Sequence, residues 1–404
     1  MGDSLRVLLV GAGVVGRAIA TDHLLHGQEV WLSDQDATVL SDACDEVLSR
    51  TNGVADSAAP WGANVPLPVV HLMPPQHDAA QTPEHSMDAL PEWLVIESIA
   101  ERMPIKQAFF AEAETWFSRP PVLTSNTSTL SIAEIASGLS QHNNRFCGMH
   151  FFMPVVGRDA AEIITHSATS DEVIRLCEAH VRSLAKASLR VKDAPGFVVN
   201  RMLAPYLNLA MQLLCAGVPA STIRKAALLY GMPMSPLELI DLIGPRTAFD
   251  GGRVVWQAFP HRMDPSPLLP AMVKRKLSGV ASGTGFYDYD RGKRTSDSLS
   301  EDAQALVQRY ERDDFGAAAM ADSPNQIAQL FAICMWRESE AILADGVADM
   351  ATIDAAMSGG LGYNAPPPNE SWREHIESIG GSTIDDLVTG FRGLKSLQPP
   401  RMTR

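Results

Sequence analysis

The chain reads Leu5-Arg-Val-Leu-Leu-Val10 and continues as Gly11-Ala-Gly13-Val14-Val15-Gly16, and this stretch decides the fold. Its first half is a nearly continuous apolar run of strand length. Residues 17–26 then carry a helical pattern that stops at Gly27, and residues 29–33 read as a second strand that ends at Asp34. A strand, a glycine-rich corner, a helix and a strand within about 30 residues predict a βαβ unit.

Each glycine of this corner has its own physical task. Gly11 permits the tight turn, Gly13 lets the backbone approach a pyrophosphate, and Gly16 lets the helix pack close to the strand. The N-terminus of the helix, at Val14 and Val15, then presents unpaired N–H groups to the anion. The pattern therefore predicts a dinucleotide site, although a plain strand-to-helix corner would also need glycines.

Asp34 lies at the end of the second strand, 18 residues after the last glycine of the corner. In a dinucleotide site an acid at this place accepts hydrogen bonds from the adenosine ribose, and it repels a 2'-phosphate. NAD is therefore expected rather than NADP. The alternative is that Asp34 is only a turn residue at the end of a strand.

Composition bounds the class of protein. The 404 residues are 46% apolar and 20% charged, which excludes disordered and fibrous chains. The net charge of -14 argues against binding to nucleic acid or to anionic membranes. Five scattered cysteines predict buried thiols and no metal site, and no apolar run reaches the length of a membrane span. We expect a cytoplasmic protein without nucleic-acid or membrane partners.

Polar motifs follow further predicted strands at 94–99 and 122–124. The carboxyl ends of parallel strands meet at the edge of the sheet where open α/β sheets bind ligands. The motifs are Ser125-Asn126-Thr127-Ser128, Gly148-Met-His150-Phe-Phe-Met153-Pro, Glu162-Ile-Ile and Asp193-Ala-Pro-Gly-Phe-Val-Val-Asn200-Arg201.

In this order the motifs resemble the L-3-hydroxyacyl-CoA dehydrogenase family. The resemblance continues through Gly231-Met-Pro-Met-Ser-Pro-Leu-Glu-Leu-Ile-Asp241 and Gly283-Thr-Gly-Phe-Tyr287. It implies an oxidoreductase of fatty acid metabolism that transfers a hydride between NAD and the C3 carbinol of an acyl substrate.

His150 is the side chain best suited to take the hydroxyl proton, because the unperturbed pKa of histidine lies near working pH. The resemblance assigns Glu162 to the far ring nitrogen, where a carboxylate fixes the tautomer and stabilises the imidazolium. The alternatives are a satisfied core histidine and a solvated helix charge.

The resemblance implies roles for five further residues. Ser128 would hold the substrate oxygen against His150, and Asn200 would donate to the acyl carbonyl. Glu101, Lys106 and Asn126 would line the cofactor. Ser128, Asn126 and Asn200 could instead be helix caps.

The chain departs from the family around its ligands. Met153 replaces the usual Asn, and Ala281 replaces a Lys that reaches the cofactor. Arg50 is the single basic residue between Asp34 and Glu97, where the family usually holds coenzyme A, and the Pro-rich stretch 59–91 shortens the usual helical pair. A carrier-bound or free hydroxy acid of polyketide-like metabolism is therefore the alternative substrate. A non-catalytic NAD-binding protein is the third hypothesis.

The predicted fold class is α/β: a Rossmann-type dinucleotide-binding domain followed by two all-α C-terminal domains. We expect the NAD-binding domain over 1–191 and helical copies over 192–295 and 296–404. The tandem copies are inferred from the likeness of residues 216–227 to residues 345–356. Longer members of the family, including the fatty-acid oxidation complex α-subunit, have this arrangement. Because the two copies could pack on each other, the chain is expected to be a monomer or a homodimer.

Overall fold

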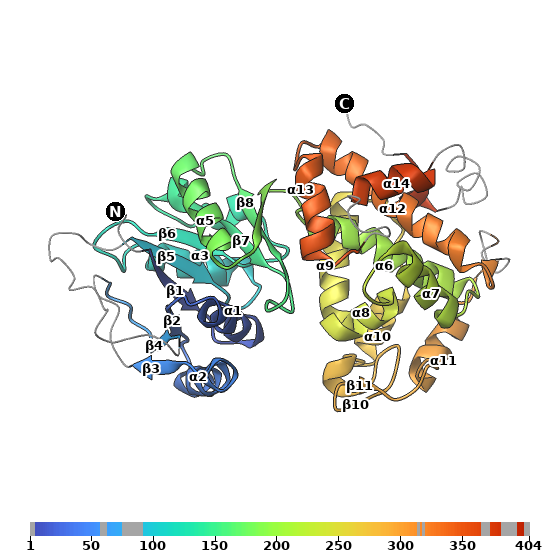
Figure 1. The fold of residues 1–404 in the computed structure, drawn as a ribbon, viewed down its shortest axis with the longest axis horizontal. Coiled ribbons are helices and arrows are strands. Elements are labelled where there is room, and N and C mark those ends of the chain that lie inside the picture. The colour runs from blue at the N-terminus through green and yellow to red at the C-terminus, as the bar shows by residue number, and fades with distance from the viewer. Residues whose placement is uncertain are drawn as a thin grey trace. The chain divides into compact units, whose positions relative to one another are not determined.

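The computed structural model describes residues 5–56, 63–74, 92–312, 316, 320–364, 372–380 and 394–399. The chain forms two compact units, Met1–Asp193 (unit 1) and Ala194–Arg404 (unit 2) (Figure 1). The further division of unit 2 into two tandem copies stays a prediction.

Unit 1 is built on a sheet with nine strands among the described residues, in the order β3-β4-β2-β1-β5-β6-β7-β8-β9. Strands β2, β1, β5, β6 and β7 run parallel, and β8 returns antiparallel to β7. The strands are β1 (Arg6–Val10), β2 (Val30–Ser33), β3 (Val54–Asp56), β4 (Val69–Met73), β5 (Trp93–Glu97), β6 (Val122–Ser125), β7 (Phe146–Phe151), β8 (Ala160–Thr165) and β9 (Ala187–Lys192). The predicted Rossmann-type sheet is confirmed.

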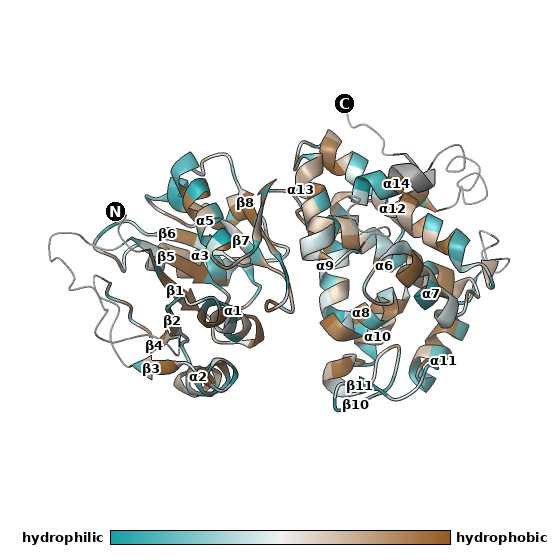
Figure 2. Ribbon diagram, viewed as in Figure 1, coloured by the Kyte–Doolittle hydropathy of each residue, from teal (hydrophilic) through white to brown (hydrophobic). Residues whose placement is uncertain are grey.

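The central strands are apolar runs because both faces of the sheet are covered. Every residue of β1 and β5 is buried, and Figure 2 shows hydrophobic residues along these strands. The helices of unit 1 are α1 (Val14–Leu25), α2 (Ala37–Thr51), α3 (Met103–Ala113), α4 (Ile132–Ala136), the 3-10 turn η2 (Asn143–Arg145) and α5 (Asp171–Ser183). One apolar core joins α1, α2 and α5 to the sheet. The ring of Phe110 on α3 packs against Phe146 at 4.7 Å.

The Pro-rich stretch 59–91, where a shortened helical pair is expected, falls mostly outside the described residues. Its described part, residues 63–74, contains the strand β4. Strand β4 pairs antiparallel with β2, and β3 pairs antiparallel with β4. The sheet is therefore extended at this edge by strands.

Unit 2 is mainly helical, as predicted. Its helices are α6 (Val199–Cys215), α7 (Ala220–Tyr230), α8 (Pro236–Ile243), α9 (Pro245–Ala258), α10 (Leu268–Lys274), η3 (Val280–Ser282), α11 (Glu301–Arg309), α12 (Pro324–Ala344), α13 (Met350–Ala355), the π-helical turn η5 (Ala356–Gly360), α14 (Trp372–Gly380) and η6 (Lys395–Leu397). The long helix α12 packs against α6, α7 and α14. At the α6–α12 contact the rings of Tyr206 and Phe331 lie 4.8 Å apart.

An all-α unit 2 was expected, but it also contains a small antiparallel hairpin, β10 (Tyr289–Asp290) and β11 (Lys293–Arg294). The two residues between the strands, Arg291 and Gly292, have φ angles of 48° and 78°. Positive φ at both central residues matches the twist of a tight hairpin. The hairpin therefore depends on the local turn at Arg291 and Gly292.

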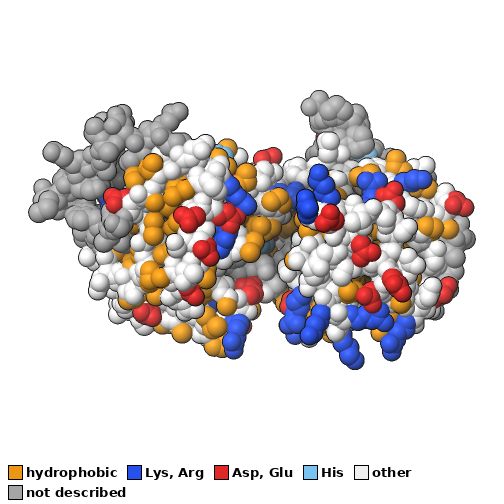
Figure 3. Space-filling model, turned by 90° about the horizontal axis from the view of Figure 1, so that it is seen from below, with side chains coloured by type: hydrophobic (Ala, Val, Ile, Leu, Met, Phe, Trp, Pro, Cys, Tyr) orange, Lys and Arg blue, Asp and Glu red, His pale blue; other side chains and the backbone are white. Residues whose placement is uncertain are grey.

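Charge is spread unevenly on a chain with a net charge of -14. Figure 3 shows Lys and Arg side chains gathered on the face of unit 2 that this view presents. At the end of α10, Lys274, Arg275 and Lys276 are consecutive exposed residues. Across the described residues, no helix has both the length and the apolar character needed to cross a membrane.

Candidate active site

The glycine corner between β1 and α1 is packed too tightly for side chains at two of its three glycines. A Cβ at Gly11, whose φ is 106°, would collide with the carbonyl of Ser98, and a Cβ at Gly16 would collide with the carbonyl of Gly11. A Cβ at Gly13 would meet no protein atom within 4 Å. Next to it, the side chain of Val14 is 72% exposed at the first turn of α1. The space in front of Gly13 is therefore open, as a phosphate group requires.

Asp34 follows β2 and reaches back to the glycine corner. Its Oδ2 accepts a hydrogen bond from the backbone N–H of Ala12 at 2.8 Å. Arg17, on the first turn of α1, was not predicted to belong to this region. Its guanidinium pairs with Glu46 at 2.6 Å and donates to the carbonyl of Ala12 at 3.1 Å. Glu46 and the Ala12 carbonyl already bind the Arg17 guanidinium. The charge at the end of β2 is therefore the negative charge of Asp34.

Lys106 of α3 is buried, and its role toward the cofactor stays a prediction. Its Nζ lies 2.5 Å from Glu97 and 3.3 Å from Glu101. Glu97 ends β5 and also accepts from Ser125 Oγ at 2.6 Å. Burial raises the pKa of Glu97, and the charge of Lys106 opposes that rise. Sequence reasoning missed Glu97, whose only signal was an acid at the end of a buried strand.

Glu101 holds the loop that follows β6. Its Oε1 accepts from Thr127 Oγ1 at 2.7 Å, from the Ser128 N–H at 3.1 Å and from Thr129 Oγ1 at 2.9 Å. Burial alone would raise the pKa of Glu101, but the charge of Lys106 and these hydrogen bonds bring it below its ordinary value. The carboxylate therefore stays ionised and fixes the backbone of Ser128.

Asn126 links the ends of β6 and β7. Its side-chain Oδ1 accepts from the backbone N–H of Phe151 at 2.8 Å, and its backbone N–H donates to the carbonyl of Glu97 at 2.8 Å. Because Phe151 directly follows His150, Asn126 holds the strand end that carries the predicted base.

His150 and Glu162 face each other across the antiparallel pair β7 and β8. The distance from His150 Nδ1 to Glu162 Oε2 is 2.7 Å, and both side chains are buried. The rings of His150 and Phe152 pack in a T-shaped arrangement, with their centroids 5.0 Å apart. The structure thus brings together the predicted base and its orienting carboxylate, near the carboxyl end of β7. The strands β1, β5 and β6 end at the same edge of the sheet because all four run parallel.

Two predicted substrate residues lie on different parts of the chain. Ser128 is half-buried in the loop held by Glu101, and Asn200 is the second residue of α6 in unit 2. Their roles toward a substrate stay predictions. Met153, the residue in place of the usual Asn, is 40% exposed in the loop after β7.

The loop after β7 has an anchor that sequence reasoning also missed. Lys186 is buried, and its Nζ donates to the carbonyls of Val155 at 3.0 Å and Arg158 at 2.7 Å. The same ammonium lies 3.1 Å from the buried carboxylate of Asp22 on α1. Lys186 therefore ties the segment that joins the His150 and Glu162 strands to α1. No sequence signal connects residues 164 positions apart.

Two family models match the chain. Residues 6–194 match the NAD-binding domain of 3-hydroxyacyl-CoA dehydrogenase, and residues 196–289 match the C-terminal domain of 3-hydroxyacyl-CoA dehydrogenase. Among curated proteins, the fatty acid oxidation complex subunit alpha of Pseudomonas savastanoi pv. phaseolicola is 28% identical over 401 residues, which is 98% of this chain and 54% of that protein. The corresponding protein of Pseudomonas aeruginosa is 32% identical over 317 residues, or 76% of this chain and 42% of that protein. The chain thus spans about half the length of the curated relatives it matches.

Solved structures of two dehydrogenases are also similar to this chain. The 3-hydroxybutyryl-CoA dehydrogenase of Escherichia coli is 26% identical with a TM-score of 0.74, covering 99% of this chain and 97% of that one. The (S)-3-hydroxybutyryl-CoA dehydrogenase PaaH1 of Ralstonia eutropha is 27% identical with a TM-score of 0.57, covering 72% of this chain and all (100%) of that one.

Proposed function

Since the chain belongs to the 3-hydroxyacyl-CoA dehydrogenase family, we propose that it interconverts the 3-hydroxy and 3-keto groups of an acyl-CoA thioester with NAD. The observation that carries this proposal is the buried pair of His150 and Glu162, with Nδ1 and Oε2 2.7 Å apart. It lies near the carboxyl end of β7, at the edge where the glycine corner also lies.

The cofactor is NAD, as the match to the family's NAD-binding domain indicates. The residues present fit it: the space at Gly13 is open, and α1 begins there with an exposed Val14. Asp34 would accept hydrogen bonds from the adenosine ribose, and its charge would oppose the extra phosphate of NADP. When bound, NAD supplies the hydride acceptor for the oxidation.

In the oxidation direction, His150 takes the proton of the substrate hydroxyl as the hydride leaves C3. Because Glu162 holds Nδ1, this proton passes to Nε2. The resulting imidazolium is stabilised by the Glu162 carboxylate, which also keeps the ring in one orientation. In the reverse direction the imidazolium returns the proton to the carbonyl oxygen. General base catalysis of this kind contributes about 100- to 10,000-fold in rate.

Ser128 and Asn200 would hold the substrate. The Ser128 hydroxyl would bind the reacting oxygen, supported by the Glu101 carboxylate that fixes the Ser128 backbone. Asn200 would donate to the thioester carbonyl from the first turn of α6. Glu101 and Lys106 would support the cofactor side of the site through their ion pair, in which Lys106 is buried and Glu101 is exposed, and Asn126 positions the end of β7.

A CoA thioester is favoured over the carrier-bound or free hydroxy acid, because two solved relatives are named as 3-hydroxybutyryl-CoA dehydrogenases. We infer a cytoplasmic location, supported by five free and buried cysteine thiols. A monomer or a homodimer is expected.

The test is a steady-state assay that follows NADH consumption by the full chain with acetoacetyl-CoA, acetoacetyl-pantetheine and free acetoacetate. We expect turnover, with the highest kcat/KM for the CoA thioester. A higher kcat/KM for pantetheine or the free acid would support the alternative substrate. NADH binding without turnover of any of the three would support a non-catalytic protein.

A further inference from the structure

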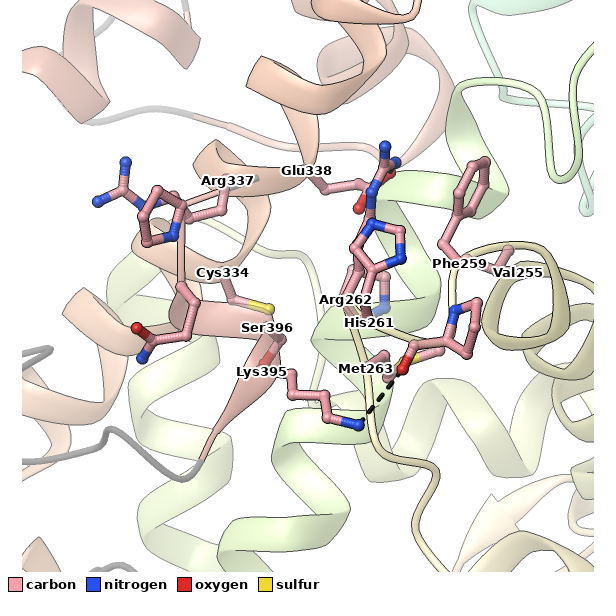
Figure 4. Close-up of a pocket in the computed structure, with 14 residues that line it drawn as sticks. Val255, Phe259, His261, Arg262, Met263, Cys334, Arg337, Glu338, Lys395 and Ser396 are labelled. Atoms are coloured by element: carbon pink, nitrogen blue, oxygen red, sulfur yellow. Dashed lines mark hydrogen bonds and ion pairs between the residues drawn. The ribbon is translucent and has the colours of Figure 1, made fainter. Parts of the chain in front are cut away.

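Unit 2 contains a cavity of about 630 Å³ that the proposed reaction does not use (Figure 4). Its volume lies within the range of about 300–1,000 Å³ that small-molecule sites occupy. Residues of α6, α9, α12 and η6 line it, together with the segment after α9. Part of the wall is apolar, formed by Val255, Met263 and Cys334. The remainder is rich in hydrogen-bond donors.

Arg262 is held firmly in this wall. Its Nη1 lies 3.3 Å from Glu338 and its Nη2 lies 3.1 Å from Asp345. The guanidinium carbon of Arg262 lies 4.2 Å from the centre of the Phe259 ring. The buried Arg201 pairs with the same Glu338 at 2.7 Å. These contacts leave Nε of Arg262 buried, with no acceptor among the described residues.

Two more residues that line the cavity have a buried donor without an acceptor among the described residues. Arg337 of α12 pairs with Glu340 through Nη1 at 3.0 Å, while its Nε is buried without an acceptor in the described part of the chain. Gln398 Nε2, next to η6, is likewise buried without one. Buried N–H groups without partners are rare because each costs its lost hydration. Three such donors on three segments of one cavity call for an acceptor within it.

We propose that this cavity binds a small organic anion. The three donor atoms are covered in the structure, so the side chains of Arg262, Arg337 and Gln398 would turn toward the ligand, and its carboxylate or phosphoryl oxygens would accept from them. An ionised acceptor makes the stronger bond to a guanidinium. An apolar body would pack against Val255 and Met263. The ligand would join residues of the segment 192–295 to residues of the segment 296–404, the two predicted helical copies. Such a ligand would therefore stabilise unit 2.

Calorimetric titration of the full chain tests the proposal with four probes: hexanoate, hexyl phosphate, 1-hexanol and inorganic phosphate. Hexanoate or hexyl phosphate should bind, and the tighter of the two identifies the anionic group. Hexanol and inorganic phosphate should bind at least about 10-fold more weakly, because hexanol lacks the anionic group and inorganic phosphate lacks the apolar body. Binding should persist with saturating NAD and acetoacetyl-CoA, a pair that occupies the dehydrogenase site but cannot react, and this separates the cavity from that site.

Variants assign the binding to the cavity. Arg337→Met keeps the stem but removes the donors, and Gln398→Leu is a second variant in case the first does not fold. Each should weaken the tighter probe by about 10-fold or more. Arg275→Met is the matched control. Arg275 forms a surface ion pair with Asp302 at a distance of 2.8 Å, and neither residue lines the cavity. No binding of either anionic probe, equal binding of hexanol, or unchanged affinity in the folded variants would overturn the proposal and leave a cavity filled by water.

Discussion

Nδ1 of His150 lies 2.7 Å from Oε2 of Glu162, and the two residues are direct partners across the antiparallel strands β7 and β8. The backbone register therefore sets this side-chain distance. A one-residue slip between the strands would place the carboxylate on the other face of the sheet. His150 and Glu162 are twelve residues apart in the chain because a hairpin joins their strands. Lys186 holds the loop of this hairpin.

Replacing the orienting carboxylate should slow catalysis without unfolding the protein. Glu162→Gln keeps the size of the buried side chain but cannot stabilise an imidazolium. We expect kcat to fall by about 100-fold or more, while the dissociation constant for NADH stays within about two-fold. Steady-state kinetics and NADH fluorescence titration measure the two quantities. Glu178→Gln on α5 is the control, and a kcat close to wild type for Glu162→Gln would contradict the role.

Asp34 should control the choice between the two dinucleotides. Asp34→Ser removes the charge that opposes a 2'-phosphate, and it also removes the acceptor for the Ala12 N–H. The ratio of kcat/KM for NAD over NADP should fall by about 10-fold or more. Asp42→Ser, an exposed change on α2, should leave the ratio unchanged. If Asp34→Ser also keeps the wild-type ratio, Asp34 does not read the ribose.

The glycines of the corner allow a matched pair of substitutions. Gly13→Ala adds a methyl group to open space and φ at Gly13 is -68°, so the free energy of unfolding should hardly change while NADH affinity falls. Gly16→Ala places a methyl group against the carbonyl of Gly11 and should lower the free energy of unfolding by about 1–3 kcal/mol. Urea unfolding and NADH titration of both variants check this. Equal destabilisation by the two changes would contradict the packing described here.

Acid should destabilise unit 1 through a buried pair of histidines. His23 and His180 have their Nε2 atoms 3.1 Å apart, and burial lowers the pKa of His23 to about 4. Since an unfolded histidine titrates near 6.5, the unfolded chain binds more protons between pH 6.5 and pH 4, and stability is lost as the pH falls through this window. The loss from His23 between pH 7 and pH 5 should be about 2 kcal/mol. Urea unfolding at the two pH values measures it.

His23→Leu removes the titrating ring and should reduce this pH dependence, whatever the variant's stability at pH 7. An equally steep loss of stability in acid for wild type and variant would contradict the assignment to His23.

Much of the sheet could be predicted from the sequence because its central strands are buried on both faces. The runs at Leu5–Val10 and around residues 94–99 are apolar for that reason, and they became β1 and β5. The His150 and Glu162 pair could be named because a family motif marks both residues. The edge strands β3 and β4 lacked such a signal, since β3 is exposed throughout.

The polar contacts beneath the site could not be predicted. Glu97 ends β5 and Lys106 lies on α3, and the two meet only in the folded chain, because a buried ion pair leaves no periodic pattern in the sequence. Asp22 and Lys186 are distant in sequence and meet only through the packing of unit 1. Local patterns describe elements, whereas these pairs depend on how elements assemble.

The most direct test of the central claim is a single-turnover measurement of hydride transfer, with enzyme in excess over acetoacetyl-CoA and NADH. Under these conditions product release does not limit the rate. His150→Gln should slow NADH oxidation by about 100-fold or more while NADH binding is retained, and His26→Asn at the far end of α1 should match wild type. A His150→Gln enzyme that transfers hydride at the wild-type rate would contradict the account.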